Sequence, residues 1–137
     1  MAIEKRNIKL MVRRLRDGRA VWYAPDQSYK RKGAVVVPFF GVPTMHTTAT
    51  STLARLGKAV VVPFFPQRTP DGRYILKLLP PLENFPSDDP VADVMRYVHI
   101  LEEQIRACPE QYFWIHRKFK DLPAGYDDYY ADLDAAK

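Results

Sequence analysis

Residues 22–41 place one carboxylate close to a group of cations. The carboxylate is Asp26, and the cations that follow it are Lys30, Arg31 and Lys32. A carboxylate at the end of a strand beside a basic loop is a common way to build a site for a phosphorylated ligand. Charged loops are usually only solvated, so this stretch indicates such a site only together with evidence from the rest of the chain.

Other kinds of chemistry have no support in the sequence. It contains no glycine-rich phosphate loop, no zinc-ligand spacing and no nucleophile elbow. The single cysteine, Cys108, has no histidine near it in the sequence, and we expect it to be unreactive. Because one cysteine cannot form an internal disulfide, a reducing compartment is favoured.

Length and charge indicate one domain with anionic partners. A chain of 137 residues with an apolar share of 47% suits a single globular domain, and no apolar run approaches the ~18 residues of a membrane-spanning helix. Residues 1–32 hold ten Lys and Arg against three acids, whereas residues 121–137 hold five Asp against one Lys. The basic end predicts nucleic acid, an anionic membrane surface or a phosphorylated lipid as partner. The acidic end predicts a poorly ordered tail at 121–137 after one domain at 1–120.

The spacing of apolar residues predicts an alternation of helices and strands. Residues 7–17 have the pattern of an amphipathic helix capped by Asn7, and a strand is expected at 20–24. The apolar run 34–40 predicts a strand that is buried on both faces, as in an α/β sheet. Residues 44–56 have a helical pattern that is rich in Thr and Ser.

The second half of the chain continues this alternation. A strand at 59–65, again expected to be buried, and a further strand at 73–79 are predicted to pair as a hairpin across the turn 70–72. Asp89 is the expected N-cap of a long helix, and the aromatic run 112–115 is a candidate edge strand. The fold class is therefore α/β, with a mixed sheet flanked by helices.

One pair of residues has a catalytic spacing. His116 and Asp121 show the H-x-x-x-x-D spacing of glycerolipid acyltransferases, in which the histidine is the general base for the acceptor hydroxyl. The pair follows the last predicted element and lies in a basic cluster next to the acidic tail. Because the chain has three histidines and 16 acids, a single match has little weight, and we do not assign it as the catalytic pair.

The chain nevertheless resembles the lipid A biosynthesis late acyltransferases, the lauroyl and myristoyl transferases of the lysophospholipid acyltransferase superfamily. The likeness covers about residues 7–120. The matching blocks, in chain order, are Leu15-Arg16-Asp17-Gly18, Trp22-Tyr23-Ala24-Pro25-Asp26-Gln27, Val37-Pro38-Phe39-Phe40-Gly41-Val42-Pro43, Leu53-Ala54-Arg55-Leu56, Val61-Val62-Pro63, Pro80-Pro81-Leu82-Glu83 and Pro109 to Lys120.

The resemblance implies an activity and its partners. Enzymes of this family transfer an acyl chain from acyl carrier protein to a phosphorylated, Kdo-bearing lipid A precursor, on the cytoplasmic face of the bacterial inner membrane. No metal or other cofactor is implied, because the acyl carrier protein thioester is itself the donor substrate. Nucleic acid is not among the implied partners.

The resemblance also implies that part of the enzyme is not encoded in this sequence. The family's N-terminal membrane helix, its histidine–carboxylate dyad and the arginine block after the dyad have no counterpart in residues 1–137, and we expect all three upstream of Met1. We therefore expect a C-terminal portion of a lysophospholipid-acyltransferase-like fold, with the N-terminal half missing, no catalytic residue and no turnover by the chain alone. The alternative is a stand-alone module that binds anionic lipid or nucleic acid.

The resemblance places the candidate site residues on the substrate-binding side. Asp26 and Gln27 are expected at the rim of the site. A wall near the acyl chain is assigned to Phe39, Phe40 and Gly41, with packing in the core as an equally open role for the two Phe residues. The expected partners of lipid phosphates or of the acidic carrier protein are Lys30, Arg31, Arg117 and Lys118, and His116 begins the matching C-terminal block.

Overall fold

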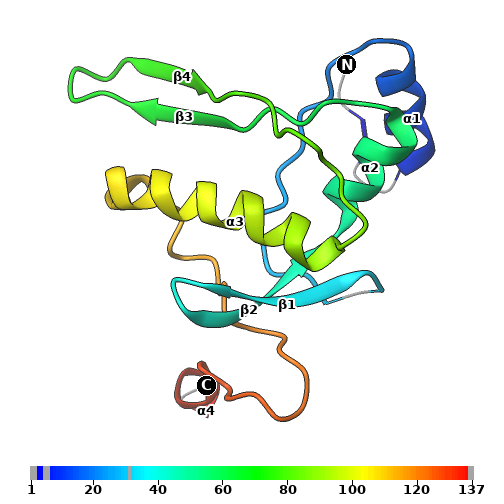
Figure 1. Cartoon of the computed structure of the whole chain (residues 1–137). Helices are drawn as coiled ribbons and strands as arrows, with labels where there is room; N and C mark the ends of the chain where they lie inside the picture. Colours follow the sequence, from blue (N-terminus) through cyan, green and yellow to red (C-terminus); the bar gives the residue numbers. More distant parts are fainter. Residues whose placement is uncertain (1–2, 5–6, 31, 136–137) are drawn as a thin grey trace.

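The computed structural model describes residues 3–4, 7–30 and 32–135. Its elements are α1 (Ile8–Arg16), β1 (Ala34–Phe39), β2 (Val42–Thr47), α2 (Ala49–Gly57), β3 (Phe64–Arg68), β4 (Tyr74–Leu78), α3 (Pro90–Ala107), η1 (Pro109–Gln111) and α4 (Ala131–Ala135). Within these residues β1 pairs with β2 and β3 with β4, both antiparallel. Figure 1 shows α3 crossing the middle of the molecule between the two hairpins. The fold is α/β as predicted, but its strands form two separate hairpins where a single mixed sheet was expected.

The core lies between α3 and the β1–β2 hairpin. Phe39 of β1 is completely buried, as are Val94 and Val98 of α3. The long helix predicted after Asp89 is confirmed, and its Val94, Val98 and Ile105 face the core. The packing of α3 across β1 fixes the position of the strand that follows the basic loop.

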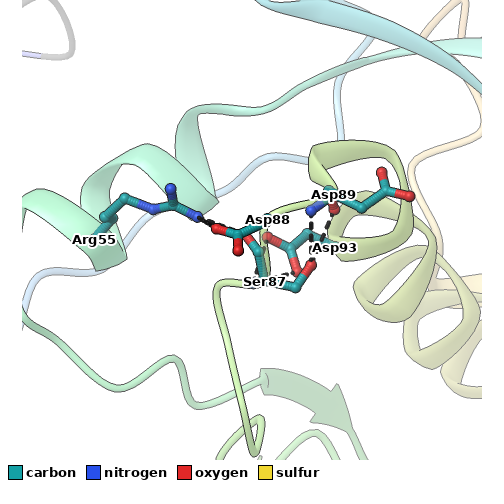
Figure 2. Close-up of polar contacts among 5 residues, drawn as sticks. All are labelled: Arg55, Ser87, Asp88, Asp89 and Asp93. Atoms are coloured by element: carbon teal, nitrogen blue, oxygen red, sulfur yellow. Dashed lines mark hydrogen bonds and ion pairs between the residues drawn. The ribbon is translucent and has the colours of Figure 1, made fainter.

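The start of α3 is fixed by acidic side chains, shown in Figure 2. The Asp89 carboxylate accepts hydrogen bonds from the N–H groups of Val91 at 2.8 Å and Ala92 at 3.0 Å, with Pro90 in the first turn. One turn further on, the buried Asp93 accepts from the N–H of Ser87 at 3.0 and 3.2 Å. The predicted N-cap is therefore confirmed, and a second acid ties the preceding loop to the helix.

The β1–β2 turn explains why the predicted helix at 44–56 is partly wrong. Phe39 pairs with Val42, so the turn consists of Phe40 and Gly41, whose φ angles of 50° and 81° are those of a type I′ hairpin turn. Gly41 adopts this angle without strain, whereas Phe40 does so at a cost. The chain therefore turns back as a strand over 42–47 before the helix starts at Ala49.

The β3–β4 hairpin confirms one prediction and corrects another. The pairing and the turn at 70–72 are as predicted, with the Thr69 N–H donating to the Arg73 carbonyl at 2.8 Å. The first strand starts only at Phe64, and all five residues of β4 are exposed. The prediction that the strand at 59–65 is buried is wrong, because Val60 and Val62 are exposed and β3 is at most half-buried.

Two predicted strands are absent from the described structure. Residues 20–24 are irregular, and Trp22 is 76% exposed. Residues 112–115 form turns, with the Trp114 indole N–H donating to the Pro109 carbonyl at 2.7 Å. A strand requires a neighbour for its backbone groups, and neither segment has one among the described residues.

The predicted N-terminal helix is confirmed. α1 begins after Asn7, whose side chain accepts from the Leu10 N–H at 3.1 Å, and it packs against α2. The contact is close, because a Cβ added to Gly57 would lie 2.7 Å from Cδ1 of Leu15. No helix in the described part of the chain has both the length and the apolar character needed to cross a membrane.

Candidate functional site

Two segments far apart in the sequence are joined by hydrogen bonds around Asp26. We call residues 26–28 the Asp26 loop and residues 116–120 the C-terminal basic segment. The Ser28 N–H donates to Nε2 of His116 at 3.0 Å, and the Ser28 hydroxyl donates to the Lys120 carbonyl at 3.0 Å. The ammonium of Lys118 donates to the main-chain carbonyl of Asp26. Three of the predicted site residues therefore meet at one place: Asp26, His116 and Lys118.

Lys118 is buried to an unusual degree for a lysine. Its exposed fraction is 2%, and its Nζ lies 5.2 Å from the centre of the Phe39 ring. Burial lowers the pKa of Lys118 to about 8, and the negative charge of Asp26 partly opposes this shift. The ammonium is thus held inside the protein, between a carbonyl, an aromatic ring and a carboxylate.

His116 accepts a hydrogen bond from Ser28 that requires the neutral form of its ring. Nε2 accepts the Ser28 N–H, so it carries no proton in this arrangement. Partial burial lowers the pKa of His116, and the positive charges of Lys120 and Lys118 lower it further, against the opposing effect of Asp26. His116 and Asp121 share no hydrogen bond or ion pair, although both lie in the described residues. The H-x-x-x-x-D spacing in this chain therefore does not form a catalytic dyad.

A second polar group lies in the interior near Lys118. The Thr44 hydroxyl donates to the Val37 carbonyl at 3.0 Å, so it must accept the contact from Nε2 of His46, also at 3.0 Å. The hydrogen of neutral His46 is thus on Nε2, and its buried Nδ1 has no partner. Burial lowers the pKa of His46 to about 3, and the nearby charge of Lys118 acts in the same direction.

The predicted aromatic wall is divided between the core and the surface. Phe39 is in the core and contacts the rings of Tyr112 at 5.9 Å and Phe119 at 6.2 Å. Phe40 stacks edge-on against Phe39 at 4.8 Å and lies beneath the Arg106 guanidinium at 4.9 Å. The N–H of Phe40 donates to the buried carboxylate of Glu102 at 2.7 Å. Phe39 thus has the core role left open above, while an acyl-chain role for the pair stays a prediction.

The remaining predicted residues occupy different surroundings. Gln27, Lys30 and Gly41 are exposed. The Arg117 guanidinium lies 5.2 Å from the centre of the Tyr130 ring, so this cation points toward the tail that precedes α4. Arg31 lies outside the described residues. The structure therefore gathers part of the predicted set around Asp26, and the phosphate or carrier-protein role of the cations stays a prediction.

Several residues of this site have no signal in the sequence. Ser28 connects to both ends of the C-terminal basic segment, and nothing in its neighbourhood distinguishes it from an ordinary loop serine. Burial of Lys118 and His46 depends on contacts between distant segments, which apolar periodicity does not report. Asp26 could be selected beforehand as a carboxylate next to cations, and His116 and Lys118 from the matching C-terminal block.

The described part of the site presents polar groups that could bind a ligand. Among the described residues, no cluster of three His, Cys, Asp or Glu side chains is placed to hold a metal ion. The third histidine, His99, is exposed on α3, and its Nδ1 lies 3.7 Å from Glu102. What the site offers a ligand is a half-buried carboxylate on a firmly held loop, with exposed polar and cationic residues beside it.

The catalytic dyad expected upstream of Met1 is a separate matter from this site. Met1 lies outside the described residues, as does the next residue along the chain. The position of the dyad ahead of Met1 stays a prediction.

Comparison with known proteins identifies the family. The family of bacterial lipid A biosynthesis acyltransferases matches residues 1–121. The lipid A biosynthesis lauroyltransferase of Escherichia coli K12 is 42% identical over 125 residues, which are 90% of this chain and 41% of that enzyme. The palmitoleoyltransferase of the same strain is 40% identical over 93% of the chain, and a lipid A biosynthesis acyltransferase of Haemophilus influenzae is 36% identical over 88%. The chain spans about two fifths of the length of these relatives. It belongs to the bacterial lipid A biosynthesis acyltransferase family.

Proposed function

We propose that this chain supplies the acceptor-binding side of a lipid A acyltransferase. In this proposal the complete enzyme transfers a fatty acyl chain from acyl carrier protein to a hydroxyacyl group of a phosphorylated, Kdo-bearing lipid A precursor. The observation that carries it is the Asp26 loop, in a chain of this family: its carboxylate stands on a loop that three hydrogen bonds, made by Ser28 and by the main-chain carbonyl of Asp26, join to a basic segment. A held carboxylate can accept hydrogen bonds from sugar hydroxyls, and cations beside it can face phosphates.

We further propose that residues 1–137 bind substrate without turning it over. Acyl transfer to a hydroxyl requires a base that is within reach of the hydroxyl proton. His46 is buried and His116 is already an acceptor for a backbone N–H, while His99 stands on the exposed surface of α3. None of these three side chains adjoins the Asp26 loop as a free base, so in this proposal the base comes from a part of the enzyme upstream of Met1.

The setting is proposed to be the cytoplasmic surface of the inner membrane. α1 carries the exposed Lys9 and Arg13 on the side away from its buried Met11. A cationic helix face of this kind is attracted to anionic headgroups. In the complete enzyme, the two hairpins and α3 would belong to the mixed sheet and flanking helices of a lysophospholipid acyltransferase fold.

The proposal is tested by binding and turnover measured on the same protein. The purified chain is titrated with phosphatidylcholine vesicles that contain a tetra-acylated, Kdo-bearing precursor, and binding is compared with vesicles that lack it. Asp26→Asn is expected to weaken precursor binding at least about tenfold, which is the effect of losing hydrogen bonds to a charged group. Asp127→Asn, in the exposed tail, serves as the matched control and is expected to change little.

Three outcomes would contradict the proposal. The first is equal binding to both kinds of vesicle, and the second is equal binding by the wild type and Asp26→Asn. The third is tighter binding to single-stranded DNA than to the precursor, which would favour the stand-alone module. Turnover with acyl carrier protein thioester by residues 1–137 alone would overturn the separate proposal that this portion cannot catalyse transfer.

A further inference from the structure

We infer that His116 and Lys118 are positioning residues, whose task is to hold the Asp26 loop in place from the C-terminal basic segment. Each of them contacts the main chain of the loop: His116 takes the Ser28 N–H, and Lys118 donates to the Asp26 carbonyl. This role rests on the proposed function, because it matters for activity only if Asp26 is part of the binding site. It differs from a direct role of these cationic groups in binding lipid phosphates.

Burial is the first argument for a positioning role. Lys118 is 2% exposed, so its ammonium has almost no surface to offer to a bound phosphate. Its hydrogen-bond partner and the nearby Phe39 ring both belong to the protein. The Asp26 carbonyl and the Phe39 ring stabilise the buried ammonium, and the ammonium in turn restrains the Asp26 carbonyl.

The geometry of the three hydrogen bonds is the second argument. Ser28 is bound at its N–H by His116 and at its hydroxyl by the Lys120 carbonyl, each at 3.0 Å. Together with the bond from Lys118 to Asp26, these contacts restrain consecutive parts of the loop from one segment. The Asp26 side chain makes none of these three bonds, so its carboxylate remains available to a ligand while its backbone is held.

The hydrogen bond from Ser28 to His116 is expected to depend on pH. The bond to Ser28 exists only while Nε2 lacks a proton, so acidification must release the Ser28 N–H from His116. The charged groups that face His116 are Lys118, Lys120 and Asp26, and Lys118, with a pKa of about 8, stays charged throughout the acid range. Since burial and the lysines lower the pKa of His116, the midpoint of the release is expected below pH 6.5.

The first experiment follows the Ser28 amide in the whole chain by NMR-detected hydrogen exchange, expressed as a protection factor at each pH. In the wild type, protection is expected to fall about 5- to 10-fold on acidification, the loss expected for one average hydrogen bond. His116→Phe is expected to lack this protection at every pH. His116→Gln, which keeps an acceptor near the position of Nε2, is expected to retain protection and to lose the pH dependence.

A second pair of variants tests Lys118, with Lys120, two residues away, as its matched control. Lys118→Met keeps the length of the buried stem and removes the ammonium, and it is expected to lower Ser28 protection several-fold. Lys120→Met removes a cation from the same segment but leaves the carbonyl that Ser28 uses, and protection above pH 7, where His116 is neutral, is expected to stay unchanged. Unchanged protection in both His116→Phe and Lys118→Met would overturn the inference, as would a wild-type protection factor that does not vary with pH.

The link to binding is tested by combining His116→Phe with Asp26→Asn in the vesicle assay. If His116 acts through Asp26, His116→Phe weakens precursor binding in the wild type but by less than about twofold in Asp26→Asn. Equal effects in both backgrounds would mean that His116 contacts the ligand itself, and this would overturn the positioning role. If the wild type binds no precursor, the proposed function fails, while the exchange data still decide whether the two residues hold the loop.

Discussion

His46 shows how a single buried side chain can control acid stability. Its ring is fully buried, Nδ1 has no partner, and its pKa is lowered to about 3. The unfolded chain takes up a proton at this residue near pH 6.5, whereas the folded protein does not until the pH approaches the pKa of about 3. The stability that depends on neutral His46 is therefore fully present above pH 6.5 and is lost progressively as the pH falls toward 3.

We predict that His46→Gln reduces the loss of stability in acid. Between pH 7 and pH 4.5, the free energy of unfolding of the wild type is expected to fall by about 2–3 kcal/mol more than that of the variant. Glutamine keeps a donor for Thr44 but does not titrate, so the comparison isolates the proton. The measurement is urea unfolding at several pH values, with His99→Gln as an exposed control. Parallel pH curves for the wild type and His46→Gln would contradict the prediction.

At the scale of residues, chemical type was predictable and burial was not. Asp26 and His116 could be chosen from the sequence, because a carboxylate beside cations and a matching block are local features. The burial of Lys118 follows from contact with the Asp26 carbonyl, 92 positions away. A lysine in a basic run is normally solvated, so local composition suggested that Lys118 is a surface cation. In the fold it is instead a buried hydrogen-bond donor.

At the scale of elements, α3 depends on the acids at its start. Asp89 accepts two N–H groups of the first turn, whereas its neighbour Asp88 is fully exposed and lies 3.5 Å from Arg55 (Figure 2). An N-cap contributes about 1 kcal/mol, and an exposed ion pair contributes much less. Since α3 provides one side of the core, its cap contributes to the stability of the whole fold.

We predict that Asp89→Ala lowers the free energy of unfolding by about 1 kcal/mol, because two helix N–H groups lose their acceptor. Asp88→Ala is the matched control, one residue away and of the same charge, and is expected to change it by less than about 0.5 kcal/mol. Chemical denaturation of the three proteins at one pH provides the measurement. A larger effect for Asp88→Ala than for Asp89→Ala would show that the ion pair with Arg55 outweighs the cap.

Helices with local signals were predictable, whereas the β1–β2 hairpin was not. α1 and α3 have caps and apolar stripes in the sequence, and both occur where they were expected. The hairpin requires Phe40 at a φ of 50°, which a sequence pattern does not suggest for an aromatic residue. Its N–H is held by Glu102 of α3, 62 residues further on, so the turn depends on a long-range contact.

At the scale of the whole molecule, the β3–β4 hairpin stands apart from the core, as Figure 1 shows. Its contacts with the rest of the chain include polar ones, such as the 2.9 Å bond from Lys77 to Gln104. Ile75, Leu76 and Leu78 are each more than half exposed. Exposed apolar strands with free edges tend to pair with other chains.

We predict that the isolated chain self-associates through this hairpin. Leu76→Lys combined with Leu78→Lys places two charges on one face of β4 and is expected to shift the protein toward the monomer at a given concentration. Lys77→Gln, on the opposite face, is the control and removes the polar bond to Gln104 without adding charge. Sedimentation velocity over a range of concentrations measures the effect. A wild type that stays monomeric and melts in one sharp transition would contradict the prediction.

The bonds between the Asp26 loop and the C-terminal basic segment also determine how the polypeptide could be divided. The exposed turn at 70–72 separates α1, α2 and the β1–β2 hairpin from α3 and the basic segment. A cut at that turn would leave one partner of every loop-to-segment bond on each piece, together with the two sides of the core. The two pieces would therefore bind each other through these contacts. Reassembly of a split protein would show that the Asp26 loop has bound the C-terminal basic segment.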